Sequence, residues 1–148
     1  MNFEKEKDFI RLINSVKHSG RLQEMKNYTQ HGRITTYHHC YSVAKTSYKL
    51  KEFFHISVDE EELIRGAMLH DYFLYDWHHF DGPLHGFYHP KAALANANQD
   101  FQLSEKEKNI IYSHMWPLTI TKVPRCREAW IVSIADKIVS TRETLFER

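Results

Sequence analysis

The chain has 148 residues, 42% of them hydrophobic and 26% charged, so we expect residues 1–148 to form a single globular domain with its own core. Its 20 basic and 19 acidic residues leave a net charge of +1 without long runs of either sign, which argues against an extended nucleic-acid or membrane surface. The chain lacks both the roughly 20 consecutive apolar residues of a membrane span and the apolar segment of a signal peptide. We therefore expect a cytoplasmic protein, and Cys40 and Cys126, which lack any paired spacing, to be reduced core residues.

The first half of the chain is predicted to be helical. Apolar residues at helix-like spacing predict a helix over residues 2–17, which the glycine of "HSG" ends. A loop through "TQHGR" follows, and Thr35 or Thr36 is suited to cap a second helix that runs to about Phe54. Ser57 and Glu60 form a possible capping box for a third helix that ends near residue 70.

The periodicity then fails between Tyr72 and Tyr88, where glycine and proline interrupt a segment rich in aromatic residues. Because glycine and proline interrupt this segment, we expect a long ordered loop there. Loops of that length are usually functional or disordered. Its histidines and aspartates are either solvated or part of a lid, in which Tyr72, Tyr75 and Trp77 would pack over a cavity.

The second half returns to helical patterns. Pro90 is suited to the first turn of a helix that carries "KAALANA". Ser104 and Glu107 form a second capping box, which opens a helix through His114 that Pro117 stops. The last helix is expected from about Arg125 to the C-terminus. Strand alternation is scarce throughout, and the predicted class is all-α.

Four of these helices each place an imidazole or a carboxylate on an apolar face: His39, His70, His114 and Asp136. Any one of them alone is more often a hydrogen-bonded core residue, and Asp136 could pair with an arginine such as Arg65. Together they indicate a shared partner, because a buried charge is costly unless it is paired or bound to a metal. A cation held between the helices would satisfy all four side chains.

Three motifs carry a family resemblance: "HHCYSVA" from His38, "GAMLHD" ending at Asp71, and "SIADK" around Asp136. They resemble the HD-domain metal-dependent phosphohydrolase superfamily, over residues 35–140. Within the first motif His39, not His38, precedes the "VA" pair by the family's four residues. The resemblance implies an HD-domain-like helical bundle with a central metal site. It also implies four ligands, with His70 and Asp71 at the catalytic centre: His39, His70, Asp71 and Asp136.

Two further motifs, "HPKAA" at His89 and "IIYSHMW" at His114, resemble those of superfamily members with two metal ions. The resemblance implies that Asp71 bridges the ions and that His89 and His114 hold the second one. His85 could take the place of His89, which we prefer because "PKAA" matches the family's helix start. Some dinuclear members have a second histidine where this chain has Met115. Mixed imidazole and carboxylate ligands suit iron, manganese or zinc.

Three basic residues are candidates for contact with a phosphate group: Arg33, Lys91 and Lys137. Lys137 has the most support, because a lysine after the last aspartate is common in the superfamily. Many members also continue the His-Asp pair with Ile-Gly-Lys, whereas this chain has "YFL". Charge that binds the substrate must therefore come from elsewhere in the chain.

The leading hypothesis is a phosphohydrolase that acts on a small phosphorylated metabolite or nucleotide by metal-activated hydroxide. The second is a di-iron oxygenase with the same six ligands, which oxygen consumption and a mixed-valent iron pair would identify. The third is a non-catalytic module in which the metal holds the helices together. This module would turn over no phosphoester, yet ligand would stabilise it.

Overall fold

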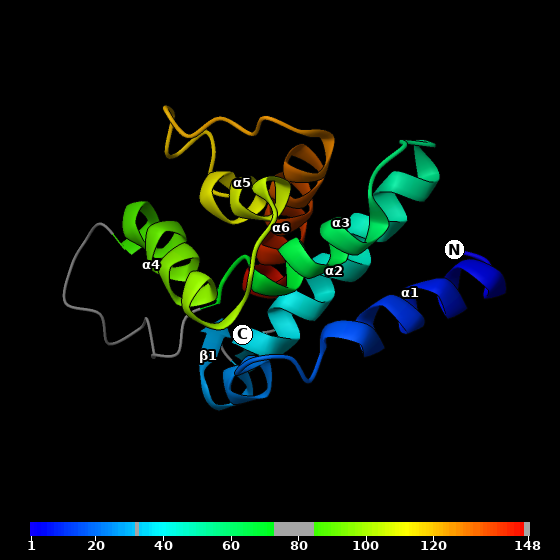
Figure 1. The fold of residues 1–148 in the computed structure, drawn as a ribbon, viewed down its shortest axis with the longest axis horizontal. Helices are drawn as coiled ribbons and strands as arrows, with labels where there is room; N and C mark the ends of the chain where they lie inside the picture. Colours follow the sequence, from blue (N-terminus) through cyan, green and yellow to red (C-terminus); the bar gives the residue numbers. More distant parts are fainter. Residues whose placement is uncertain (32, 73–84, 147–148) are drawn as a thin grey trace.

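The computed structural model describes residues 1–31, 33–72 and 85–146 (Figure 1). Those residues form a mostly helical structure with one two-stranded hairpin, which confirms the all-α prediction. Its elements are α1 (Phe3–Val16), the 3-10 helix η1 (Leu22–Asn27), β1 (Thr29–His31), β2 (Ile34–Thr35), α2 (Thr36–Phe53), α3 (Glu60–Leu69), α4 (His85–Asp100), α5 (Glu105–Ser113) and α6 (Arg127–Phe146). Among the described residues, every helix is too short or too polar to span a bilayer.

The helix starts follow local capping chemistry. The Thr35 side chain accepts a hydrogen bond from the His38 amide, and Ser104 with Glu107 forms the predicted capping box. The capping box predicted at Ser57 is wrong. Asp59 caps α3 instead, and its carboxylate accepts a hydrogen bond from the Glu62 amide at 2.9 Å. An aspartate caps a helix as well as a serine does, so the sequence alone offered two equivalent starts.

The start of α4 also differs from the prediction. The helix begins at His85, so the loop expected through Tyr88 ends earlier, and Pro90 lies inside the helix. Pro90 is the sixth residue of α4 and has no amide proton, so the helix forgoes the bond to the carbonyl four residues earlier, in its first turn. The rest of the predicted loop, including Tyr75, Trp77 and the pair His78 and His79, lies outside the described residues.

The segment "TQHGR" was predicted to be a loop, but its first three residues form β1, which pairs with β2 just after the segment. In the antiparallel pairing of β1 with β2, Thr29 lies opposite Thr35. The Thr36 amide then donates to the Tyr28 carbonyl at 2.8 Å, which joins the hairpin to the start of α2. Strands of two or three residues are too short to show alternation, so no sequence pattern predicts them.

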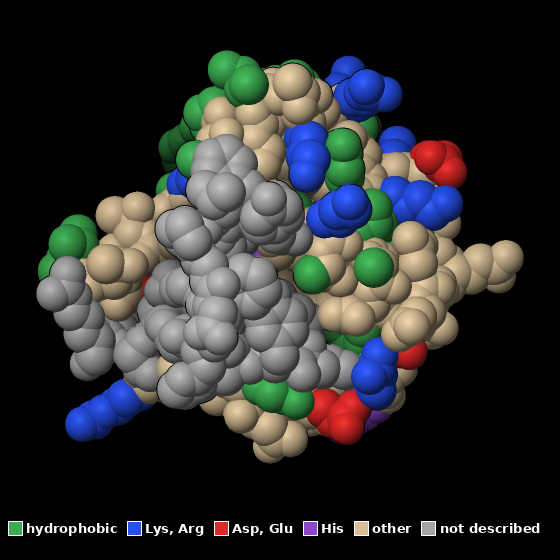
Figure 2. Space-filling model, turned by 90° about the vertical axis from the view of Figure 1, so that its left-hand side faces the viewer, with side chains coloured by type: hydrophobic (Ala, Val, Ile, Leu, Met, Phe, Trp, Pro, Cys, Tyr) green, Lys and Arg blue, Asp and Glu red, His purple; other side chains and the backbone are tan. Residues whose placement is uncertain are grey.

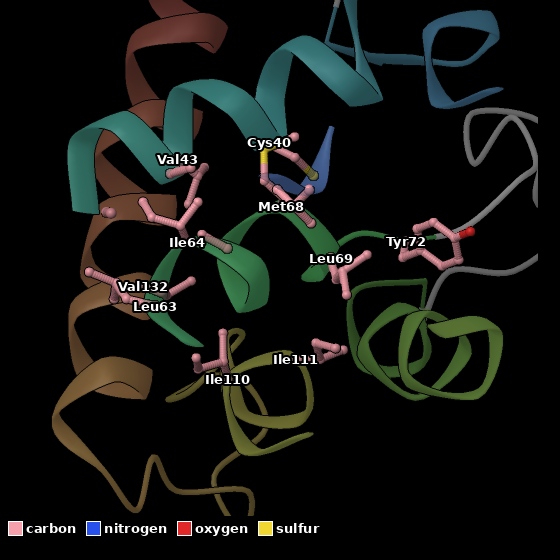
Figure 3. Close-up of a cluster of buried hydrophobic side chains, with 14 of the residues drawn as sticks. Cys40, Val43, Leu63, Ile64, Met68, Leu69, Tyr72, Ile110, Ile111 and Val132 are labelled. Carbon is pink, nitrogen blue, oxygen red and sulfur yellow. The ribbon is translucent and has the colours of Figure 1, made fainter. Parts of the chain in front are cut away.

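Helix α3 lies in the middle of the core and packs against α1, α2, α5 and α6 (Figure 1). Figure 3 shows Ile64 and Met68 of α3 between α2 and α5, with Val132 of α6 beside Leu63. A Cβ at Gly66 would collide with the side chain of Ile110, so glycine permits α3 to approach α5 closely. The C-terminal end of α3 is thus held firmly by packing.

Both cysteines are free thiols, as predicted. Cys40 is buried in the core next to Met68 (Figure 3), whereas Cys126 is only partly buried.

Candidate metal centre

Six buried histidine and aspartate side chains converge from five helices. One group comprises His39 of α2, His70 and Asp71 at the end of α3, and Asp136 of α6, and the other comprises Asp71, His89 of α4 and His114 at the end of α5. Within each group the possible ligand atoms lie within 4.8 Å of one another. The structure therefore brings together all six residues that the resemblance implied.

His39 lies between two carboxylates of α6. Its Nε2 is 3.0 Å from Oδ1 of Asp136, and its Nδ1 is 2.8 Å from Oε2 of Glu143. Burial by itself lowers the pKa of His39, but the hydrogen bonds to Asp136 and Glu143 outweigh burial and raise the pKa to about 10. The exposed neighbour His38 has no part in the cluster, which agrees with the choice of His39 from the sequence.

His70 and His114 are positioned in the same way by two different helices. Each is the C-cap residue of its helix, and its Nδ1 lies close to the carbonyl three residues earlier, at 2.6 Å from Ala67 and 2.8 Å from Ile111. Because a carbonyl only accepts hydrogen bonds, Nδ1 must carry the proton. Both rings therefore turn Nε2 toward the cluster, where a neutral imidazole offers its lone pair to a metal.

Asp71 lies between the two groups and divides its oxygens between them. Its Oδ2 is 3.3 Å from Nε2 of His70 and 3.4 Å from Nε2 of His39. Its Oδ1 is 3.2 Å from Nε2 of His89 and 3.3 Å from Nε2 of His114. A carboxylate with one oxygen facing each group is arranged to bind two ions at once.

The electrostatics of the cluster suit a divalent cation. Burial tends to raise the pKa of Asp71 and of Asp136, but the surrounding histidines outweigh burial and hold both values well below the usual range. Burial also opposes the protonation of His70, yet Asp71 and Asp136 raise the pKa of that ring well above its usual value. Without metal, the raised pKa values of His39 and His70 favour a positive charge on these rings beside the two aspartates. A divalent cation between the same aspartates would supply that positive charge when the rings are neutral.

Two atoms of the cluster show what a metal would satisfy. His70 Nε2 and Asp71 Oδ1 are buried and make no hydrogen bond of acceptable geometry to any described residue. Buried polar atoms are nearly always hydrogen-bonded or bound to a metal, and an exception requires a cause. A cluster of imidazole and carboxylate donors fits a first-row transition metal such as iron, manganese or zinc.

The three predicted phosphate contacts lie outside the cluster. Arg33 and Lys91 are exposed. The ammonium of Lys137 donates to Ser133 Oγ at 2.9 Å and lies 3.3 Å from the carbonyl of His114, so it links α6 to the end of α5. Contact of these residues with substrate stays a prediction.

Two alternatives that the sequence left open are not supported. Tyr72 does not cover the cluster, because its hydroxyl lies 2.5 Å from Asp100 Oδ2 and accepts a hydrogen bond from the Arg21 amide. The alternative partner considered for Asp136 also fails, because Arg65 lies 3.6 Å from Glu107 instead. Both residues serve packing between helices.

Sequence reasoning missed two polar residues at the cluster. Gln30 of β1 is buried and donates from Nε2 to Asp71 Oδ2 at 3.0 Å. No pattern marked it, because the hairpin itself was not foreseen. Glu143 does have a signal: it follows Asp136 by seven residues, which places both on one face of a helix.

Comparison with known families agrees with this geometry. The family model of the HD domain matches residues 36–140, well over half of the chain. The chain belongs to the HD domain family. HD domains bind divalent metal ions, and the clustered histidines and aspartates of this HD domain are suited to that role. Searches of curated proteins and of solved structures gave no match.

Proposed function

We propose that this HD domain is a phosphohydrolase that uses two divalent metal ions to hydrolyse a small phosphorylated metabolite or nucleotide. His39, His70, Asp71 and Asp136 would hold one ion, and Asp71, His89 and His114 the other. The observation that carries the proposal is the position of Asp71, whose two oxygens face different histidine pairs at 3.2–3.4 Å. Membership of the HD domain family supports a hydrolase-type function.

Two bound divalent ions would supply Lewis acidity to a phosphoryl group and lower the pKa of water. The chain itself orients the donors. Gln30 holds Asp71 through Oδ2, and Ser140 Oγ lies 3.3 Å from Asp136 Oδ1. These hydrogen bonds keep both carboxylates turned toward the histidines, and the burial of all six donors excludes bulk water from around them.

An anionic substrate is also consistent with the surface. Figure 2 shows lysine and arginine side chains gathered in the upper right part of the face on the α4 side of the molecule. Lys91 of α4 is exposed two residues after His89, and Arg33 is exposed just before β2. Basic side chains on this face would attract phosphate groups and raise the rate of encounter.

The test combines metal analysis with a substrate screen. Protein purified without chelator is analysed for metal content, and its hydrolysis of phosphomonoesters, phosphodiesters and nucleotides is measured with added manganese, zinc or iron. We expect about two ions per chain and release of phosphate from at least one class. Asp71→Ala should abolish both, whereas His38→Ala, which alters an exposed neighbour of a ligand, should retain both.

Other outcomes would replace the proposal. A mixed-valent iron pair with oxygen consumption and no phosphate release would identify the di-iron oxygenase with the same ligands. Bound metal without turnover of any phosphoester, combined with ligand-dependent stabilisation, would identify the non-catalytic module.

A further inference from the structure

Glu143 is a buried carboxylate next to the metal centre that belongs to neither ligand group. Its side chain is only 1% exposed, and Oε2 lies 2.8 Å from Nδ1 of His39. Among the described residues, Oε1 makes no hydrogen bond, and no lysine or arginine forms a salt bridge with Glu143. His39 is thus its ionic partner in the described part of the chain.

The position of Glu143 is unfavourable for a carboxylate in two other respects. Burial of a charged group is costly unless it is paired. Glu143 also lies in the last turn of α6, which ends at Phe146, where the helix dipole disfavours negative charge. An apolar residue would fit both the burial and the helix end better, so the interaction with His39 must account for the glutamate.

We propose that Glu143 is a positioning residue that holds the proton of His39 on Nδ1 and thereby directs the Nε2 lone pair at the metal. A carboxylate in its ionised form only accepts hydrogen bonds, so the contact at 2.8 Å selects one tautomer of the ring. A carboxylate acceptor also makes a ligand histidine a stronger donor to its metal. The inference rests on the metal centre proposed above but not on the reaction.

His39 differs in this respect from His70 and His114. His70 and His114 donate their Nδ1 protons to the neutral carbonyls of Ala67 and Ile111. The Nδ1 of His39 faces the carboxylate of Glu143 instead. Glu143 therefore strengthens binding of the ion at His39, His70, Asp71 and Asp136, and it leaves the ion at His89 and His114 largely unaffected.

Zinc affinity measured by competition with a chelator tests this proposal. Glu143→Gln preserves size and one acceptor oxygen but removes the charge. Glu128→Gln is the matched control, because Glu128 lies in the same helix, its side chain is 3% exposed, and it belongs to neither ligand group. Its carboxylate accepts from the Asp59 amide at 2.8 Å and lies 3.4 Å from the Lys106 ammonium. We expect Glu143→Gln to weaken the binding of one of the two zinc ions by roughly 10- to 100-fold. The other zinc ion, and both ions in Glu128→Gln, should keep wild-type affinity.

Several results would overturn the proposal. Unchanged zinc affinities in folded Glu143→Gln would refute it, and so would equal weakening in Glu128→Gln. If Glu143→Gln does not fold, nitrogen-15 spectra of the zinc-loaded wild type decide, because His39 must show a protonated Nδ1 and a metal-bound Nε2. Wild-type protein that binds no zinc would refute the metal centre and this role with it. Loss of one ion in Glu143→Gln without any phosphoester turnover in wild type would support this role and reject only the reaction.

Discussion

Removal of metal should destabilise the fold, because the centre joins five helices at one point. Metal ligands that still pair with each other without metal, such as His39 with Asp136, do not contribute to the expected loss in free energy of unfolding. The loss comes from His70 Nε2 and Asp71 Oδ1, which are buried without a hydrogen bond of acceptable geometry in the described structure. At about 1–3 kcal/mol for each unsatisfied buried atom, the expected loss in free energy of unfolding is about 2–6 kcal/mol.

For a chain of this length, each kcal/mol shifts the melting temperature by about 2–4 °C, so chelation should lower it by roughly 4–24 °C. Circular dichroism melts of metal-loaded and stripped protein, with metal content measured on the same samples, provide the assay. Restored zinc should restore the melting temperature. In Asp71→Asn, which loses the shared ligand, chelator should have much less effect. An unchanged melting curve in protein shown to have lost its metal would refute the reasoning.

Three further predictions address separate parts of the molecule. His114→Ala should halve the metal content while preserving helical circular dichroism, because in the proposed centre that ring would hold only the second ion; an unchanged stoichiometry of one in wild type and variant would reject the dinuclear centre. In stripped protein, the raised pKa of His39 should stabilise the fold fully below about pH 6.5 and lose that contribution as the pH rises through about 10, so His39→Gln should flatten this part of the stability profile measured by urea unfolding. Gly66→Ala should lower the melting temperature through its collision with Ile110, and Ile110→Val should relieve part of that loss in the double variant. Additive effects of those two changes would contradict the close packing of α3 on α5.

Local sequence was sufficient for much of the fold and of the candidate site. Capping residues such as Thr35 and Ser104 act within three residues of themselves, and helical periodicity shows which side chains share an apolar face. His39, His70, His114 and Asp136 stood out for that reason, as polar groups on faces that had to be buried. The family motifs then implied Asp71 and His89 as their partners.

What the sequence by itself determined is therefore the set of donors and the helices that carry them, because both depend on neighbours along the chain. Only the tertiary structure decided how those donors are used, because distances between helices depend on packing. The two-sided position of Asp71 follows from the close approach of α3 to α5, and the contact of Glu143 with His39 joins residues 104 positions apart. Lys137 follows Asp136 in the chain, and only the packing shows that its ammonium lies beside Ser133 and the carbonyl of His114, while its contact with substrate stays a prediction. Chain spacing places a side chain on a helix face, and the partner across the interface decides what it contacts.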